Sequence, residues 1–145
     1  MKIRIIWTGK TKERYINEGI NHYLKLLGPA ARVSIIEVKE EKGREKEKML
    51  AAEGKRILKQ AQSYILLDER GKEFTSREFA AFLENKSAVD FVMGGPYGVS
   101  DEVREKAAGA IALSRMTFTH ELARVFFLEQ LYRATTIIKG KEYHH

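Results

Sequence analysis

Short apolar runs alternate with helical patterns along the whole chain. The runs of strand length lie at Ile3–Trp7, Val33–Val38, Tyr64–Leu67, Val89–Met93 and Ala110–Leu113. The helical patterns lie at Lys12–Leu27, Glu45–Ala61, Arg77–Glu84, Asp101–Ala108 and Glu121–Ile138. This alternation predicts a mostly parallel sheet with helices on both faces. No linker, repeat or low-complexity segment interrupts it, so the pattern predicts a single α/β domain over residues 1–145.

Helix-end signals support these boundaries. Ser76 and Ser100 each stand at the start of a helical pattern, where a hydroxyl can accept a hydrogen bond from a free backbone N–H, and we expect both to be N-caps. Gly28 and Pro29 follow the first helical pattern and should end it.

The last helical pattern has no broad polar face. Its apolar positions are Leu122, Ala123, Val125, Phe126, Phe127, Leu128, Leu131, Ala134, Ile137 and Ile138. A helix that is apolar nearly all round must be buried on more than one side. We expect one side to pack on the sheet and another on a second subunit, which predicts a homodimer; the alternative is a central helix within a monomer.

Positive charge is concentrated in the first part of the chain. The 145 residues carry a formal net charge of +6, from 26 Lys and Arg against 20 Asp and Glu. Residues 1–62 hold 15 basic and 8 acidic residues, a net +7, whereas residues 63–145 hold 11 and 12, a net −1. A basic face is typical of proteins that bind a polyanion such as RNA; a solvated charged surface is the other interpretation.

The composition also bears on the compartment. The chain has no cysteine, so neither a disulfide framework nor thiolate chemistry is expected. No run of about 18 apolar residues is present, which argues against a membrane span. The first residues, Met1–Trp7, are broken by charge and fit a first strand better than a signal peptide. We therefore expect a cytoplasmic protein without membrane contact.

The glycine-rich segment Gly94–Gly98 lies between a predicted strand and a predicted helix. Its spacing matches neither the dinucleotide fingerprint nor the phosphate-binding loop. The following helix begins with Asp101 and Glu102, whose carboxylates would repel an anion at that helix terminus. We therefore expect backbone contact with a ligand that carries no phosphate there; a tight turn without a ligand is the alternative.

A second loop, Leu113–Phe118, follows the last predicted strand. It mixes apolar and hydroxyl side chains, which suit a purine ring and a thioether chain held by backbone groups. Leu67 ends another predicted strand. Because the carboxyl ends of parallel strands meet at one edge of a sheet, Leu67, Gly94 and the Leu113–Phe118 loop are expected to form one pocket.

The chain resembles a known family over essentially its whole length. The similar segments are Gly9-Lys10, Arg32–Val38, Val92–Gly95, Leu113–Phe118, His120, Arg124, Glu129-Gln130, Tyr132–Ala134 and Tyr143-His144. In order and spacing they resemble the SPOUT, or trefoil-knot, methyltransferases, and within them the small enzymes that methylate N3 of a pseudouridine in bacterial large-subunit rRNA. Thr119 departs from the pattern, because relatives usually carry proline before the histidine, and this leaves the rigidity of the loop open.

The resemblance implies a fold, a cosubstrate and an assembly. The carboxyl-terminal segment would thread through a loop and form a deep knot, which general topology rules would not suggest. The knot would bind S-adenosylmethionine in a bent form. The implied binding residues are Leu67, Gly94, Leu113, Ser114, Arg115, Met116, Thr117 and Phe118. Relatives are homodimers whose pockets abut the partner, and they act on 23S rRNA in the assembled ribosome.

Three residues near the end of the chain are candidates for catalysis. A sulfonium methyl group is already activated, so in-line geometry supplies much of the rate. The ring imide that accepts it must lose a proton and have its anionic carbonyl groups stabilised. Arg133 suits that charge or a phosphate, His144 suits proton transfer, and Tyr143 suits stacking or hydrogen bonding to the base. The competing interpretation of Tyr143–His145 is the remnant of a purification tag.

Two other protein classes remain as alternatives. A non-catalytic RNA-binding protein would use the basic residues but has no need of two pocket loops. A nucleotide-binding α/β enzyme would need phosphate motifs that the chain lacks. His22 and His120 are isolated in sequence, and no cluster has metal-ligand spacing, so no metal is expected.

Overall fold

The computed structural model describes all residues, 1–145, and contains one five-stranded sheet. The strands are β1 (Lys2–Thr8), β2 (Arg32–Val38), β3 (Ile65–Glu73), β4 (Ala88–Met93) and β5 (Gly109–Ala112). The helices are α1 (Arg14–Leu27), α2 (Lys46–Gln60), α3 (Ser76–Leu83), α4 (Asp101–Lys106) and α5 (His120–Ile138). All strand pairs are parallel and their order is β2-β1-β4-β3-β5. The predicted single α/β domain is confirmed.

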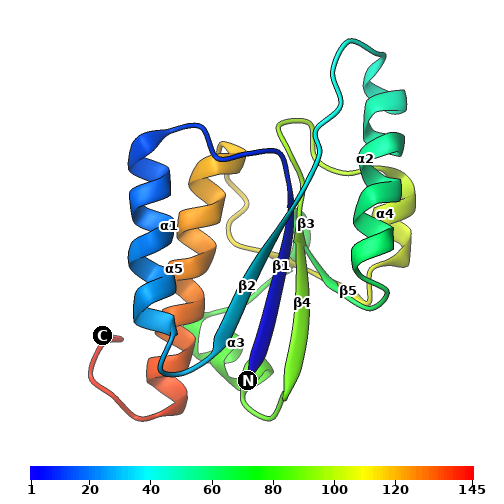
Figure 1. Cartoon of the computed structure of the whole chain (residues 1–145). Coiled ribbons are helices and arrows are strands. Elements are labelled where there is room, and N and C mark those ends of the chain that lie inside the picture. The colour runs from blue at the N-terminus through cyan, green and yellow to red at the C-terminus, as the bar shows by residue number, and fades with distance from the viewer.

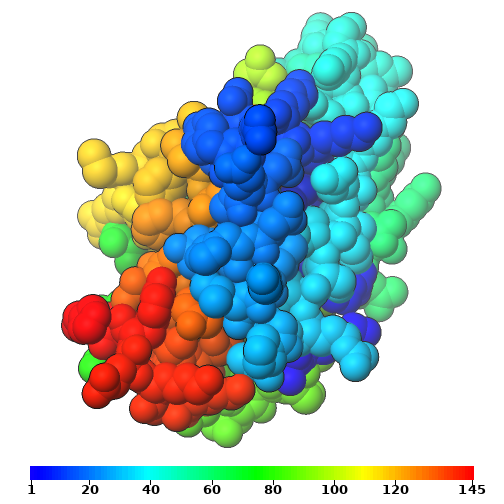
Figure 2. Space-filling view, turned by 60° about the vertical axis from the view of Figure 1, so that its left-hand side comes forward, coloured from blue at the N-terminus to red at the C-terminus, as the bar shows by residue number.

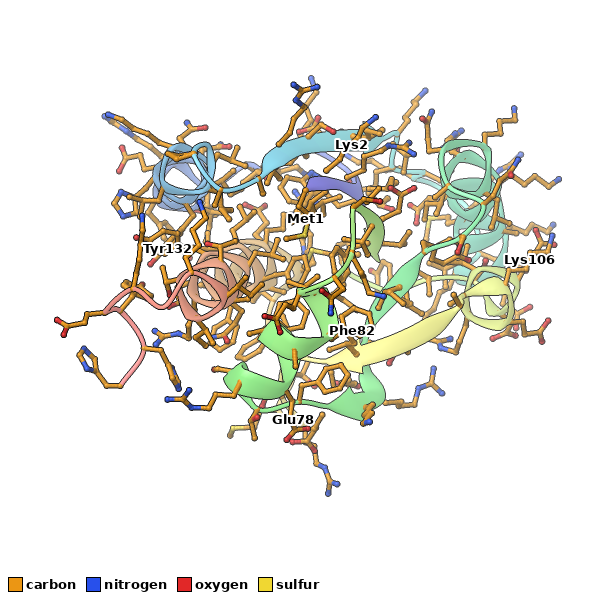
Figure 3. The ribbon with its side chains drawn as sticks, turned by 90° about the horizontal axis from the view of Figure 1, so that it is seen from below. Met1, Lys2, Glu78, Phe82, Lys106 and Tyr132 are labelled. Atoms are coloured by element: carbon orange, nitrogen blue, oxygen red, sulfur yellow. The ribbon has the colours of Figure 1, made fainter.

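Helices cover both faces of this sheet. Figure 1 shows α1 and α5 on one side and α2 and α4 on the other, and the view along the sheet in Figure 3 adds α3 to the first group. Alternate residues of β1 serve the two sides: Ile3 and Ile5 belong to the core under α1, α3 and α5, whereas Ile6 belongs to the core under α2 and α4. The strand's period of two thus accounts for two separate hydrophobic cores.

The third strand is longer than its apolar run indicates. It continues through the charged residues Asp68–Glu73 with an irregularity between Leu67 and Lys72, and it resumes pairing with β5 there. A Cβ on Gly71 would lie 2.6 Å from the carbonyl carbon of Ala110, so only glycine permits this approach. The predicted end at Leu67 was therefore wrong, because the chain bulges after Leu67 and then pairs again.

Three hydroxyl side chains cap helices. Ser100 accepts from Val103 N at 3.2 Å, as predicted. The cap of α3 is Thr75 rather than Ser76; Thr75 accepts from Glu78 N at 3.1 Å, which makes Ser76 the first helical residue. Thr119 accepts from Leu122 N at 3.2 Å and caps α5. A proline at position 119 could not make this bond, so Thr119 fixes the start of α5 in a different way.

Helix α5 packs between α1 and α3 and also holds the loop after β1. Glu121 accepts from the backbone N–H groups of Lys12 and Glu13, at 3.1 and 3.0 Å, and so caps α1, whose own N-cap makes no side-chain bond. The fully buried Arg124 donates to the carbonyl oxygen of Thr8 at 2.7 Å and stacks 4.5 Å from the centre of the Trp7 ring. The first turns of α5 thereby fix the loop that joins β1 to α1.

The burial of α5 is largely internal. Its buried apolar residues, Phe127, Leu128, Leu131 and Ala134, belong to the core shared with α1 and α3. Leu122 and Phe126 remain 43% and 40% exposed. The prediction that the helix is buried on more than one side is confirmed, whereas the second subunit and the trefoil knot stay predictions. None of the helices has the length and apolar character needed to cross a membrane.

Candidate functional site

A cavity of about 640 Å³ opens beside the bulge of β3 and the carboxyl ends of β4 and β5. Its lining comprises Lys46, Leu67, Asp68, Glu69, Arg70, Met93, Gly94, Gly95, Pro96, Tyr97, Gly98, Val99, Arg104, Leu113, Ser114, Met116, Thr117, Phe118, His120 and Ala123. The volume falls within the range of about 300 to 1,000 Å³ that is usual for small-molecule sites. The structure therefore brings together Leu67, Gly94 and most of the Leu113–Phe118 loop, which the sequence places in one pocket.

The Gly94–Gly98 loop closes on itself at the edge of this cavity. Gly98 N donates to the carbonyl oxygen of Gly95 at 3.0 Å, and Gly98 has a φ of +82°. A Cβ on Gly94 would lie 2.5 Å from the carbonyl oxygen of Gly98. Glycine is required at position 94 because the backbone at Gly98 already fills the space that a side chain would occupy.

The Leu113–Phe118 loop supplies the opposite wall. Five of its six residues line the cavity, and the exception is Arg115, whose side chain is 87% exposed and pairs with Glu73. Thr117 donates from Oγ1 to Glu69 Oε2 at 2.7 Å, which joins this loop to the bulge in β3. The predicted contact of Arg115 with a cosubstrate would therefore have to use its backbone.

Charged residues at the mouth of the cavity form an ordered group that the sequence did not indicate. Arg104 donates from Nε to Asp68 Oδ2 at 2.9 Å, and Arg70 N donates to Asp68 Oδ1 at 2.9 Å. Burial works against ionisation of Asp68, but these bonds outweigh it and hold the pKa of Asp68 below its ordinary value. The sequence did not indicate Asp68, because β3 was expected to end at Leu67. It did not indicate Arg104 either, because the helix of Arg104 carries no motif.

His120 is the first residue of α5 and also lines the cavity. Burial and the nearby positive charge of Arg124 lower the pKa of His120, so its imidazole is neutral at physiological pH. A neutral ring can either donate or accept a hydrogen bond toward the cavity. No group of three or more His, Cys, Asp or Glu residues is arranged to hold a metal ion.

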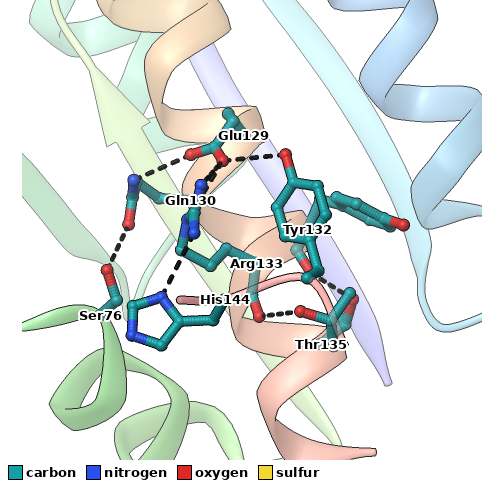
Figure 4. A network of polar contacts seen from close by, with 9 residues as sticks. Ser76, Glu129, Gln130, Tyr132, Arg133, Thr135 and His144 are labelled. Carbon is teal, nitrogen blue, oxygen red and sulfur yellow. Dashed lines mark hydrogen bonds and ion pairs between the residues drawn. The ribbon is translucent and has the colours of Figure 1, made fainter. Parts of the chain in front are cut away.

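The three predicted catalytic residues form a second cluster. Arg133 Nη1 lies 3.2 Å from His144 Nδ1, and the guanidinium carbon lies 4.8 Å from the centre of the Tyr143 ring. Glu129 accepts from Arg133 Nη2 at 2.6 Å and from the Tyr143 hydroxyl at 3.1 Å (Figure 4). Burial and this carboxylate raise the pKa of Tyr143 to about 12. Sequence reasoning found Arg133, Tyr143 and His144 but not the role of Glu129 in joining them.

The cavity lies at the start of α5, whereas the tail cluster, formed by Glu129, Arg133, Tyr143 and His144, lies along its second half. His120 begins the helix at the cavity and Arg133 lies thirteen residues later, a distance of about 20 Å at 1.5 Å per residue. Figure 1 shows the chain's C-terminus at the far end of α5 from the carboxyl ends of the strands. In the space-filling view the tail (red) and the loop around residue 115 (yellow) occupy separate places (Figure 2). A single subunit thus does not bring the two predicted groups into contact.

An exposed apolar strip lies beside the cavity. Met116 is 78% exposed, and Leu122 and Phe126 are each about two-fifths exposed. The rings of Phe118 and Phe126 stack with their centres 5.1 Å apart, which joins the loop to α5. Large apolar side chains grouped beside a cavity are typical of surfaces that contact a partner.

Comparison with known proteins identifies relatives over the full length. A family model described as "Predicted SPOUT methyltransferase" matches residues 1–144. A protein of Thermodesulfovibrio yellowstonii named Ribosomal RNA large subunit methyltransferase H is 50% identical over 145 residues, covering 99% of both chains. Proteins with the same name from Geotalea daltonii and Geobacter sulfurreducens are 44% and 46% identical and are covered in full, as is this chain.

A solved structure shares the fold at much lower identity. A Bacillus anthracis protein, described as a "putative RNA methyltransferase", superposes with a TM-score of 0.57 at 10% identity, over 99% of each chain. At this identity the likeness concerns the fold alone. The match of the family model to nearly every residue, together with relatives at up to 50% identity, leads to one conclusion: the chain belongs to the SPOUT methyltransferase family.

Proposed function

We propose that this protein transfers a methyl group from S-adenosylmethionine to N3 of a pseudouridine in 23S rRNA of the assembled ribosome. The observation that carries the proposal is the cavity at the bulge of β3 and the ends of β4 and β5, formed without any phosphate-binding motif. The names of the full-length relatives support rRNA as the substrate. We propose in addition the identity of the cosubstrate, the target nucleotide and the role of each residue.

The cavity residues fit the proposed cosubstrate. Leu67, Met93 and Ala123 offer an apolar wall for a purine, and Gly94 and Gly95 bring the backbone to the edge of the cavity. Glu69, exposed at the mouth, suits a positively charged sulfonium or amino group. Leu67, Gly94 and Leu113–Phe118 would hold the molecule, with Arg115 contributing only its backbone.

The chemistry asks for positioning more than for strong acids or bases. The cosubstrate supplies an activated methyl group on a sulfonium sulfur. The residues of this chain align the acceptor base with that methyl group and stabilise negative charge on the base. Arg133, a permanent cation beside His144, is the residue best suited to that charge.

We further propose that the active enzyme is a homodimer in which one subunit's cavity receives the partner's tail. The separation of about 20 Å along α5 keeps a subunit's own tail away from its own cavity. The exposed strip of Met116, Leu122 and Phe126 beside the cavity is the surface we assign to the subunit contact. A site built from two chains would place Arg133, Tyr143 and His144 against the bound base.

Mixed dimers provide a direct test of this shared site. One subunit carries Gly94→Val and an intact tail; the other lacks Tyr143–His145 and keeps an intact cavity. If the site is shared between chains, the mixed dimer contains one complete site and methylates rRNA much faster than either parent homodimer. An inactive mixed dimer, shown by light scattering to be a dimer, would place each site within a single chain.

Cosubstrate and target are tested separately. Calorimetry with S-adenosylmethionine, ATP and NAD should show binding of the first alone. Mass spectrometry of 23S rRNA from a deletion strain should show an unmethylated pseudouridine that the purified protein then methylates. A non-catalytic RNA-binding protein would bind rRNA without binding S-adenosylmethionine, and a nucleotide-dependent enzyme would prefer ATP or NAD.

A further inference from the structure

The carboxylate of Glu129 organises the whole tail cluster (Figure 4). Its Oε1 accepts from Arg133 Nε at 3.1 Å, from Arg133 Nη2 at 2.6 Å and from the Tyr143 hydroxyl at 3.1 Å. Its Oε2 accepts from Gln130 Nε2 at 2.8 Å, and Gln130 Oε1 in turn accepts from Ser76 of α3 at 3.2 Å. An ordinary ion pair within a helix would join only two side chains, whereas this one ties α3, α5 and the tail together.

The contact between Arg133 and His144 determines which nitrogen of His144 carries the proton. A guanidinium has only donors, so His144 Nδ1, 3.2 Å from Arg133 Nη1, must accept. An imidazole that accepts at Nδ1 carries its hydrogen on Nε2. The nitrogen of His144 that is not bonded to Arg133 is therefore an N–H donor, and the ring has no free lone pair for a substrate proton.

The other members of the cluster also present hydrogen atoms. The Tyr143 hydroxyl donates to Glu129 and remains protonated. Arg133 has five N–H groups, of which two face Glu129 and one faces His144, so two are left for another acceptor. The tail cluster thus offers three unused N–H donors, two from Arg133 and one from His144. None of its three predicted catalytic residues is free to accept a proton.

We propose that Glu129 is a positioning residue and that the tail it holds binds the acceptor base through donors only, with His144 Nε2–H and Arg133 directed at carbonyl oxygens of the base. The proposal rests on the proposed function and gives His144 a role other than proton transfer. The N3–H bond of the base breaks with its proton passing to solvent water. The nitrogen lone pair then forms the bond to the methyl carbon as the carbon–sulfur bond breaks toward sulfur.

Two substitutions of His144 separate a donor from a base. In His144→Gln the amide nitrogen replaces imidazole Nε2 as a donor but has no basicity, whereas His144→Ala has neither property. We expect His144→Ala to slow single-turnover methylation about tenfold or more, the loss of one hydrogen bond to a charged group, and His144→Gln to stay within about threefold of wild type. Equal, large losses in both variants would overturn the donor role.

Glu129→Gln tests the positioning role, with Glu142→Gln as its matched control. Glu142 is an exposed carboxylate in the same tail. We expect Glu129→Gln to slow methylation about tenfold while leaving calorimetric affinity for S-adenosylmethionine unchanged, because Glu129 is not among the residues that line the cavity. Glu142→Gln should retain the wild-type rate. A Glu129→Gln protein that methylates at the wild-type rate would overturn the positioning role.

Imidazole NMR gives a readout that does not depend on rRNA methylation. In ¹H–¹⁵N spectra of the full-length protein, His144, assigned by its loss in His144→Gln, should show the hydrogen on Nε2. In Glu129→Gln, where Arg133 is no longer fixed, the same signal should shift toward a mixture of tautomers. A wild-type His144 with its hydrogen on Nδ1 would overturn the proposal even if methylation is confirmed, whereas absence of methylation in wild type alone would instead refute the proposed function.

Discussion

Individual residues with very similar sequence contexts have different structural roles in this protein. Gly94 and Gly95 are neighbours, yet a Cβ on Gly94 would lie 2.5 Å from the Gly98 carbonyl oxygen, whereas a Cβ on Gly95 would meet nothing closer than Thr8, at 3.6 Å. The first distance is a collision and the second an ordinary contact. Of these two neighbours, only Gly94 therefore needs to be glycine for the loop to close.

This difference leads to a paired prediction. Gly94→Ala should push the loop away from Gly98, destabilise the protein by about 1 to 3 kcal/mol and abolish calorimetric binding of S-adenosylmethionine. Gly95→Ala, whose Cβ points at a residue outside the cavity lining, should keep both the unfolding temperature and the affinity close to wild type. Undiminished binding by a folded Gly94→Ala protein would contradict the assignment of this loop.

Glu121 provides a second prediction at the residue scale. Burial works against its ionisation, but the backbone N–H groups of Glu13 and Lys12 outweigh burial and lower the pKa of Glu121. We expect Glu121→Gln to reduce the free energy of unfolding at pH 7 by about 1 to 2 kcal/mol, measured by urea denaturation. Glu18→Gln, which removes an exposed carboxylate paired with Arg14, should change it by less than about 0.5 kcal/mol.

The pH dependence of this effect has a definite sign. Because the pKa of Glu121 is lower in the folded state than in the unfolded state, its stabilisation is complete above the unfolded-state pKa. It is lost as the pH falls from that value through the folded-state pKa. The stabilities of wild type and Glu121→Gln should therefore converge in acid, and a difference that stays constant down to low pH would contradict the role of the charge.

At the scale of elements, the tail can be separated from the rest of the fold. Tyr143 and His144 contact Glu129 and Arg133 in the second half of α5, while the strands, the cavity loops and the apolar strip lie elsewhere. The pair of Glu129 and Arg133 lies within α5 and needs no tail residue to form. Losing the tail should therefore remove contacts to the acceptor base and leave the cosubstrate site intact.

We predict that removal of Tyr143–His145 leaves a dimer that binds S-adenosylmethionine but methylates ribosomes about 100-fold more slowly or worse. His144→Ala alone should lose less, because Arg133 still stabilises the base. Single-turnover methylation, with affinity measured in parallel, decides the matter. Removal of His145 alone, an exposed residue, is the control and should have no effect. Full turnover by the truncated protein would mean that the tail is inert.

Sequence patterns predicted most elements to within one or two residues, because apolar periodicity follows directly from burial. They failed for β3, where pairing resumes across a charged bulge that only Gly71 permits. The residue types of the tail indicated a cluster, but the central role of Glu129 depends on the chain turning back after α5. The arrangement of Asp68 and Arg104 depends on two elements that are distant in sequence, which local patterns do not report.

At the scale of the whole molecule, basic residues lie at the same edge as the cavity. Lys10 and Lys12 are exposed on the loop that follows β1, and Arg14 begins α1. Glu121 holds the backbone of this loop, so its lysines are presented from a fixed position. A fixed cationic loop beside the cavity is well placed for phosphate groups that flank the target nucleotide.

Reversing Lys10, Lys12 and Arg14 to glutamate should weaken ribosome binding and reduce its salt dependence, while affinity for S-adenosylmethionine stays unchanged. The control reverses Lys48, Lys55 and Lys59, exposed residues of α2 on the other face, with the same change in net charge. If ribosome binding by the two triple variants depends equally on salt concentration, the β1–α1 loop does not contact RNA and the effect is one of net charge alone.

The cap that α5 provides for α1 also has a consequence for biosynthesis. Glu121 follows Lys12 and Glu13 by 109 and 108 residues, so the first helix is made long before the carboxylate that caps it. At translation speeds of 5 to 20 residues per second, the interval is on the order of 5 to 20 s. Throughout that time the apolar face of α1, with Ile16, Ile20 and Leu27, has no α5 to pack against. The nascent chain must therefore remain unaggregated, alone or on a chaperone, until its last helix arrives.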